Sequence, residues 1–445
     1  MTFRERLMLA CTGLLVTACA VVFLRYGTYQ FLVRNLGWDN AWTQTIFMDD
    51  TTLQHYEAPR NIPADEVPID WAARYPFKEA SSIPPKKESR LKKAEQKFHE
   101  QAGKFEAWTN RRFYSYMHLV ESMCRYQGLI GWNIPIYDDY VSPTELPDGH
   151  LTKFMKKKDV SIPIQQTVAL ADFCQSNSIP FLVVLAPNNN ASNAPYEGKL
   201  DFSNENGDVF LTALQAKGIR CLDLRPILDE QVENHLNLFF RTDHHWKPDV
   251  ARAAVQSIAN ILNTFYGYQM DVSLLNAENF HEDIYPSRYL GTFGQKFTTS
   301  RTQPDDFPLI YPNFPVTFQL QIPSMELDRT GDFSIVYDYR QLESKDLRHA
   351  LFPTYMYGER ALISIQNLQK TDHHKLLLVR DSFGNMMIPF LALGMEKIDA
   401  IDMRFFTGSL QSYIQKEQPD TVVLCYTISE FNWSEAYPRS LFNFN

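Results

Sequence analysis

The stretch LLLVRDSFGN, Leu376–Asn385, is an apolar run that ends in polar residues and a glycine. Leu376–Val379 predicts a buried β-strand, and residues 381–384 predict a turn that leads into a helix. In an open parallel sheet, active sites gather at the carboxyl ends of the strands. The pattern therefore places Ser382 at that edge of the sheet, on a turn that lets its hydroxyl project.

A second motif, RTDHHWKP, spans Arg241–Pro248. Asp243 and His245 are two positions apart, so their side chains point to the same side of an extended chain. Pro248 suits the first position of a helix. A carboxylate beside an imidazole and a serine at a strand-to-helix turn are the parts of a serine nucleophile system, which is recognised by roles and not by sequence order.

These residue types predict specific roles. Ser382 is the expected nucleophile, His245 the base that takes its proton, and Asp243 the carboxylate that holds the His245 tautomer. His244 alternates to the opposite side of an extended chain, so it is expected to pack or to form hydrogen bonds. Either motif alone is typical of an ordinary turn or loop, and the catalytic interpretation depends on their occurring together.

The rest of the chain has an α/β pattern, in which short apolar runs alternate with segments of helical period. Such alternation predicts a mostly parallel sheet with helices on both faces. Residues 268–372 break the pattern with many prolines and aromatics and predict a β-rich insertion, including the alternating runs VTFQLQI and DFSIVYDY. The predicted strands are Ile179–Pro187, Ile219–Leu224, Leu238–Thr242, Leu376–Val379, Ile398–Met403 and Thr421–Tyr426.

The N-terminus predicts export. Arg4 and Arg6 precede the uncharged run Leu7–Leu24, which at about 1.5 Å per residue is just long enough to span a bilayer of roughly 30 Å. We expect residues 1–34 to be an uncleaved signal anchor, with cleavage near Cys19 as the alternative. Residues 35–100 are expected to form a linker and the start of a long helix, and residues 101–445 the main domain.

Composition excludes some function classes. The formal net charge of −9 argues against a nucleic-acid partner, because phosphate binding needs clustered Lys and Arg. The six cysteines show no CxxC and no metal-ligand spacing, so buried thiols are expected, with a Cys174–Cys221 disulfide as the alternative in an exported domain. No cofactor is expected.

A second Asp-His-His cluster occurs in Thr371–His374 and raises the question of a shared metal site. It precedes the strand whose far end carries Ser382, which puts it on the opposite rim of the sheet. We therefore expect no metal shared between the two clusters.

With these motifs in place, the chain resembles the DHHW-type proteins and the related SGNH-like O-acetyltransferases of bacterial exopolysaccharide assembly, including alginate-acetylation proteins of the periplasm. FRTDHHW and VRDSFGN carry the resemblance. Upstream, KFEAWTNRRFYSYMHLV and GLIGWNIPIYDDY are similar to the segment that precedes the catalytic domain in that family. The resemblance covers about residues 100–430.

The resemblance implies a flavodoxin-like SGNH fold and an acetyl-serine intermediate at Ser382, with His245 as base and Asp243 as its partner. It also implies a polysaccharide acceptor, membrane attachment through the N-terminal helix, and a multispanning membrane acyltransferase that delivers acetyl groups. The domain is then expected in the periplasm or outside the cell.

Members of the family use further groups for the oxyanion hole, and the motifs do not identify them here. The candidates for oxyanion or substrate binding are Asn385, Gly291, Asn188 and Arg380, the last with a strand-end salt bridge as the alternative.

Two other functions remain open from the sequence. One is a carbohydrate acetylesterase that uses the same three residues with water as acceptor. The other is a non-catalytic glycan-binding subunit of a polysaccharide modification complex. A metal-dependent hydrolase is a third and less favoured interpretation.

Overall fold

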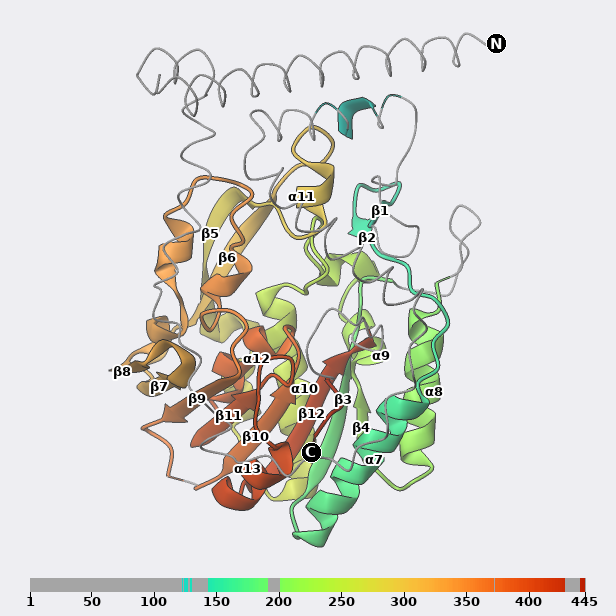
Figure 1. The fold of residues 1–445 in the computed structure, drawn as a ribbon. Coiled ribbons are helices and arrows are strands. Elements are labelled where there is room, and N and C mark those ends of the chain that lie inside the picture. Colours follow the sequence, from blue (N-terminus) through green and yellow to red (C-terminus); the bar gives the residue numbers. More distant parts are fainter. Residues whose placement is uncertain are drawn as a thin grey trace, which may run out of the picture. The chain divides into compact units, whose positions relative to one another are not determined.

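The computed structural model describes residues 143–190, 201–371, 373–428 and 441–444, with Ser122, Cys124–Tyr126 and Leu129 (Figure 1). The sheets described below, and the helices beside them, belong to the second of two compact units, which includes Ile134–Asn445. The expected anchor and linker lie outside the described residues, as does nearly all of the long helix. Across the described ranges, none of the helices combines the length and apolarity that crossing a bilayer requires.

An eight-stranded mixed sheet forms the centre of this unit, in the order β4-β3-β12-β10-β11-β9-β7-β8. Its first five strands are parallel, and the last three are antiparallel. In sheet order the strands are Cys221–Asp223, Phe181–Ala186, Thr421–Thr427, Lys375–Arg380, Lys397–Ile401, Leu362–Asn367, Phe318–Ile322 and Leu327–Gly331. The predicted α/β class is confirmed, with a sheet that is mixed because part of the insertion joins it.

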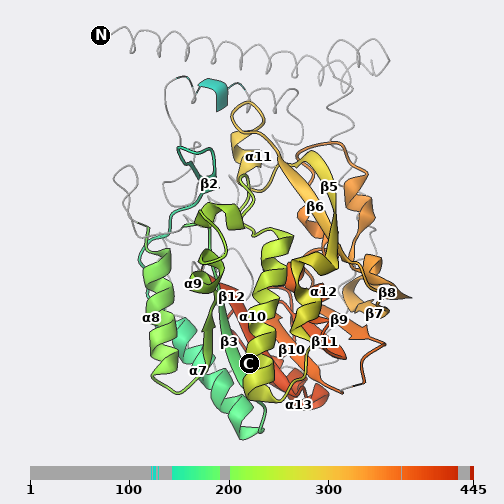
Figure 2. The ribbon, with the colours of Figure 1, turned by 180° about the vertical axis from the view of Figure 1, so that it is seen from behind.

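Helices cover both faces of the sheet (Figures 1 and 2). On β10, Leu376 and Leu378 belong to the core shared with α10 and α12, whereas Leu377 and Val379 belong to the core shared with α7, α8 and α13. A strand buried on both faces reads as a continuous apolar run, which is why β10 was recognisable from sequence. The helices are α7 (Ser161–Ser176), α8 (Ser203–Gln215), α10 (Pro248–Tyr266), α12 (Gly384–Leu391) and α13 (Leu410–Glu417).

Helix α10 follows the Asp-His motif directly. Pro248 occupies its first turn, and Gly267 ends it in the left-handed conformation with φ 78°. Its buried side chains recur at helical spacing and pack on the sheet beside α12. Because α10 begins directly after the motif, the packing of α10 fixes the position of the Asp-His motif relative to the core.

The β-rich insertion is divided between two places. Strands β5 (Phe280–Tyr289) and β6 (Asp305–Pro312) form a separate antiparallel hairpin, whereas β7, β8 and β9 extend the main sheet. β7 and β8 are joined by one short helical turn, η5 (Pro323–Met325), which makes the pair antiparallel.

The run DFSIVYDY is not the alternating strand that its pattern suggests. It begins with a 3-10 helix, η6 (Phe333–Val336), because the Asp332 side chain accepts the Ser334 N–H at 2.9 Å and caps the turn. The remaining short elements are β1 (Thr144–Glu145), β2 (Leu151–Thr152), α9 (Leu224–Asp229), η2 (His235–Leu238), η3 (Val272–Leu275), η4 (Ala277–Asn279), α11 (Gly294–Phe297), η7 (Tyr339–Leu342) and η8 (Phe352–Thr354).

The described cysteines are free thiols, so the alternative of a Cys174–Cys221 disulfide is not realised. Burial raises the pKa of both thiols to about 12. They act as apolar packing residues at ordinary pH.

Candidate active site

Ser382 lies on the turn between β10 and α12 and is 4% exposed. The preceding carboxylate holds this turn. Asp381 accepts the Phe383 N–H at 2.9 Å and, from the end of β12, the Thr427 N–H at 2.6 Å. Gly384 allows the tight approach of the turn to β10, since a Cβ there would lie 2.6 Å from Arg380 Cβ.

The Asp-His motif forms a tight loop and not the extended strand predicted for Leu238–Thr242. A bridge between Phe239 and Trp246 closes the loop, and the Phe240 N–H donates to the His245 carbonyl at 3.2 Å. Inside the loop, Asp243 Oδ1 accepts the His245 N–H at 2.9 Å. The loop therefore folds the carboxylate back against the imidazole that follows it.

The three predicted catalytic side chains meet. His245 Nδ1 is 2.6 Å from Asp243 Oδ1, and His245 Nε2 is 2.8 Å from Ser382 Oγ, across 137 residues of sequence. Asp243 is fully buried, and His245 and Ser382 are nearly so. The Phe352 ring stacks on the imidazole at 3.8 Å between centroids, which shields this hydrogen-bonded chain from water.

The environment keeps Asp243 ionised. Burial opposes ionisation, but the His244 and His245 rings, a hydrogen bond from His245 and the Thr292 N–H at 2.6 Å hold the pKa of Asp243 well below its usual range. The buried Tyr289 hydroxyl is a further hydrogen-bond partner of this carboxylate. An ionised Asp243 favours the proton on His245 Nδ1, which leaves Nε2 to accept from Ser382.

Asp305, at the start of β6, supports the loop from outside and was not found from sequence. It accepts the backbone N–H groups of Arg241 (3.0 Å) and Thr242 (2.8 Å) and the Thr242 hydroxyl (2.6 Å). No motif surrounds it in the sequence. Its role follows only from the tertiary structure, in which the β5–β6 hairpin brings Asp305 against the Asp-His loop.

Gly291 has a different role from the oxyanion donor expected of it. Its N–H already donates to Thr242 Oγ1 at 2.9 Å. A Cβ at this position would lie 2.4 Å from Asp243 Cβ and 2.7 Å from the Thr242 carbonyl oxygen. Gly291 is therefore needed because the chain passes directly against the Asp243 side chain.

Two other candidates are structural. Arg380 is fully buried, and its Nη1 lies 3.0 Å from Asp402 Oδ2. It forms the strand-end salt bridge that was the alternative to sugar binding. Asn188, at the end of β3, accepts the Asn190 N–H through Oδ1 at 3.1 Å and holds its own turn, with β12 between its strand and β10.

Asn385 remains a candidate for binding the oxyanion. The first N–H groups of the turn are used internally, since those of Phe383, Gly384 and Asn385 donate to Asp381 Oδ1, the Asp381 carbonyl and the Ser382 carbonyl. The Asn385 side-chain amide, three residues from Ser382, is fully buried and has no hydrogen-bond partner within the described part of the chain.

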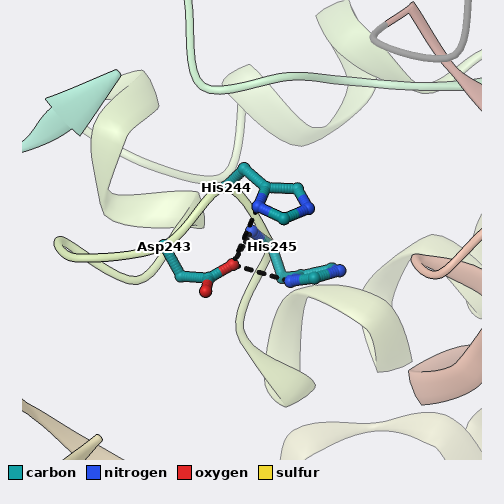
Figure 3. Close-up of side chains that lie close together, drawn as sticks. All are labelled: Asp243, His244 and His245. Atoms are coloured by element: carbon teal, nitrogen blue, oxygen red, sulfur yellow. Dashed lines mark hydrogen bonds and ion pairs between the residues drawn. The ribbon is translucent and has the colours of Figure 1, made fainter. Parts of the chain in front are cut away.

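Asp243, His244 and His245 carry the ligand types of a metal site, with ligand atoms within 4.8 Å of one another (Figure 3). His245 Nδ1 and Asp243 Oδ1, however, already share the hydrogen bond that orients His245 toward Ser382. The arrangement therefore fits a hydrogen-bonded triad better than a metal centre.

The second Asp-His-His cluster, in Thr371–His374, lies at the start of β10. There His373 pairs with Glu396, and His374 stacks on Tyr268.

We predict that Gly291→Ala lowers the rate of Ser382 acylation at least about 10-fold, because the new methyl displaces Asp243 from His245, with a loss of roughly 1–3 kcal/mol in unfolding free energy. Rates of labelling by an activated acetyl ester, measured beside urea unfolding, test this. Gly218→Ala is the control: its φ of +77° makes alanine cost about 1–2 kcal/mol, but its Cβ would meet nothing within 4 Å. Equal labelling rates in the two variants would contradict the role of Gly291.

We predict that Arg380→Met lowers the free energy of unfolding by about 2–3 kcal/mol, because it leaves Asp402 buried with Arg404 as its remaining cationic partner. Chemical denaturation measures this loss. Lys157→Met breaks the exposed Lys157–Glu205 pair and is expected to cost under about 1 kcal/mol. A loss in Arg380→Met no larger than in this control would show that the buried pair is not stabilising.

A family model described as "SGNH hydrolase-like domain, acetyltransferase AlgX" matches residues 179–308, a segment that holds Asp243, His245, Gly291 and Asp305 but ends before Ser382. Among the curated proteins, none matches the chain.

Two solved structures show the same fold. Bacillus cereus PatB1, solved with a sulfonyl adduct, has a TM-score of 0.54 at 18% identity and covers 66% of this chain and 95% of its own. A DHHW family protein from Eubacterium siraeum has a TM-score of 0.51 at 17% identity and covers 66% and 92%. The family-model match confirms, for residues 179–308, the resemblance to SGNH hydrolase-like acetyltransferase domains that the two motifs predicted, and the two solved structures show that the chain shares their fold.

Proposed function

We propose that this protein is an exported O-acetyltransferase that carries an acetyl group on Ser382 and transfers it to a hydroxyl of a cell-surface polysaccharide. The observation that carries the proposal is the hydrogen-bonded chain Ser382–His245–Asp243, with contacts of 2.8 and 2.6 Å. The match to an acetyltransferase family model supports the choice of acetyl transfer among the reactions that such a triad performs.

In the first step, His245 Nε2 takes the Ser382 proton while Oγ attacks the acetyl carbonyl carbon of the donor. The bond between the acetyl carbon and the leaving group then breaks, and His245 gives the proton to that group. In the second step, His245 deprotonates the acceptor hydroxyl, whose oxygen attacks acetyl-Ser382 and releases the serine with the proton. Asp243 stabilises the imidazolium in both steps.

The buried amide of Asn385 is the proposed donor to the oxyanion. Its Nδ2 has no other hydrogen-bond acceptor in the described structure, so an oxygen that becomes negative near Ser382 gives it one. Preorganised donors in a site shielded from water are among the largest contributions to acyl-transfer catalysis.

We propose further that the reaction takes place outside the cytoplasm. The apolar run Leu7–Leu24 between arginines supports an N-terminal membrane anchor with the domain outside the cytoplasm. An acetyl group used there must come across the membrane, so we propose a multispanning membrane acyltransferase as the donor partner.

We predict that a serine-reactive sulfonyl fluoride labels Ser382 of the purified protein, because His245 activates this hydroxyl. Peptide mass spectrometry is expected to find the adduct in the wild type, none at this position in Ser382→Ala, and labelling slower by at least about 100-fold in His245→Ala. Asp243→Asn is expected to slow labelling comparably, because it removes the group that fixes the His245 tautomer.

Ser203 is the internal control, since its buried hydroxyl donates to the Asp201 carboxylate and not to an imidazole. It is expected to stay unlabelled. Labelling of Ser203 and Ser382 at similar rates, or no adduct at Ser382 in folded protein, would reject the nucleophile and favour a non-catalytic glycan-binding subunit.

A further inference from the structure

His244 does not point away from the triad, as alternation along an extended chain predicted. The tight loop places its ring beside that of His245, with centroids 3.9 Å apart and planes 37° from parallel. The Nδ1 atoms of both rings face one oxygen, Asp243 Oδ1, at 3.2 Å from His244 and 2.6 Å from His245. Figure 3 shows the second nitrogen of each ring, Nε2, on the far side from Asp243, both directed the same way.

His244 is also the part of this cluster that solvent reaches. Its side chain is 32% exposed, against 7% for His245 and 1% for Asp243. The His244 Nδ1 atom is buried, so the exposed part of the ring is its outer edge. Phe293 and Phe383, the other rings in contact with His244, are buried. Among these side chains, His244 is therefore the one that a molecule approaching His245 from solvent meets.

The protonation state of His244 follows from its neighbours. Burial is the largest cause that lowers the pKa of His244, to about 3; any positive charge on the neighbouring His245 ring, and the charges of Lys153 and Arg404, act in the same direction, and the Asp243 carboxylate offsets only part of this. The ring is neutral at ordinary pH. Its Nδ1 lies 3.2 Å from Asp243 Oδ1 without hydrogen-bond geometry, and the negative charge of the carboxylate favours the proton on this nitrogen. In that tautomer Nε2 carries a lone pair and accepts a hydrogen bond.

We propose that His244 and His245 together recognise a vicinal diol of the sugar acceptor. His245 Nε2 receives the proton of the attacking hydroxyl, and His244 Nε2 accepts a hydrogen bond from the neighbouring hydroxyl. The inference deepens the proposed function and rests on it. The two ring centroids lie 3.9 Å apart and the second nitrogens of both rings are directed the same way, so adjacent hydroxyls of one sugar can each approach one nitrogen.

The second half-reaction then has a defined geometry. The attacking oxygen forms its bond to the acetyl carbon as the Ser382 Oγ–carbon bond breaks, and its proton passes through His245 Nε2 to Ser382 Oγ. His244 exchanges no proton and acts as a positioning residue. A hydrogen bond to the neighbouring hydroxyl holds the attacking oxygen over the ester and raises transfer relative to hydrolysis.

The test compares two acceptors that differ in one donor hydrogen. Full-length protein is acetylated with 4-nitrophenyl acetate, and transfer to cyclohexane-1,2-diol is measured beside transfer to 2-methoxycyclohexanol, which keeps the ring and both oxygens but has one hydroxyl. One hydrogen bond is expected to favour the diol about 10-fold in wild type. His244→Phe is expected to bring the ratio close to one, and His244→Gln, which keeps an acceptor oxygen, to retain part of it.

The burst of 4-nitrophenol, which reports acetylation of Ser382, and the thermal midpoint show for each variant whether the first half-reaction and the fold survive. A merely structural role would change both acceptors alike and leave their ratio as in wild type. A wild-type ratio near one, retention of the preference in His244→Phe, or acetyl-Ser382 that reacts only with water would each overturn the inference. Loss of the burst in wild type would instead reject the proposed function.

Discussion

The buried carboxylate of Asp243 is the constraint on which the site depends. A carboxylate out of contact with water is costly unless hydrogen bonds and opposite charge offset its desolvation. Here the His245 N–H, the His245 ring, the Thr292 N–H and the Tyr289 hydroxyl supply that compensation. Because these partners come from the loop itself, from the end of β5 and from the chain just after it, the carboxylate joins two segments that the sequence keeps apart.

The close packing of the Asp-His loop against the β5–β6 hairpin explains why particular residues are needed around Asp243. Gly291 is required because its backbone passes directly against Asp243, and Asp305 secures the Arg241 and Thr242 backbone from the second strand of the same hairpin. On the other side, Asp381 plays the matching role for Ser382 by joining the ends of β10 and β12. Both reactive groups are thus held by a neighbouring carboxylate that accepts backbone N–H groups, so their separation is set by the backbone and not by flexible side chains.

Sequence reasoning succeeded where the signal is local. An apolar strand followed by a polar turn locates Ser382, and the spacing of Asp243 and His245 places them on one element. It was wrong where the path of the chain decides. His244 was placed on the opposite side because an extended chain was assumed, whereas the bridge between Phe239 and Trp246 closes a tight loop. Contacts between distant segments, such as those of Asp305, leave no local pattern to read.

Asp243 also links the two half-reactions of the proposed mechanism. One of its oxygens faces Nδ1 of both imidazoles, so the same charge sets the tautomer of the base and that of the ring beside it. A change at Asp243 therefore affects proton transfer and acceptor placement together, whereas a change at His244 removes no hydrogen bond of the chain Asp243–His245–Ser382. The second histidine of the motif thus gives the site a way to alter which acceptor it uses while the serine chemistry stays intact.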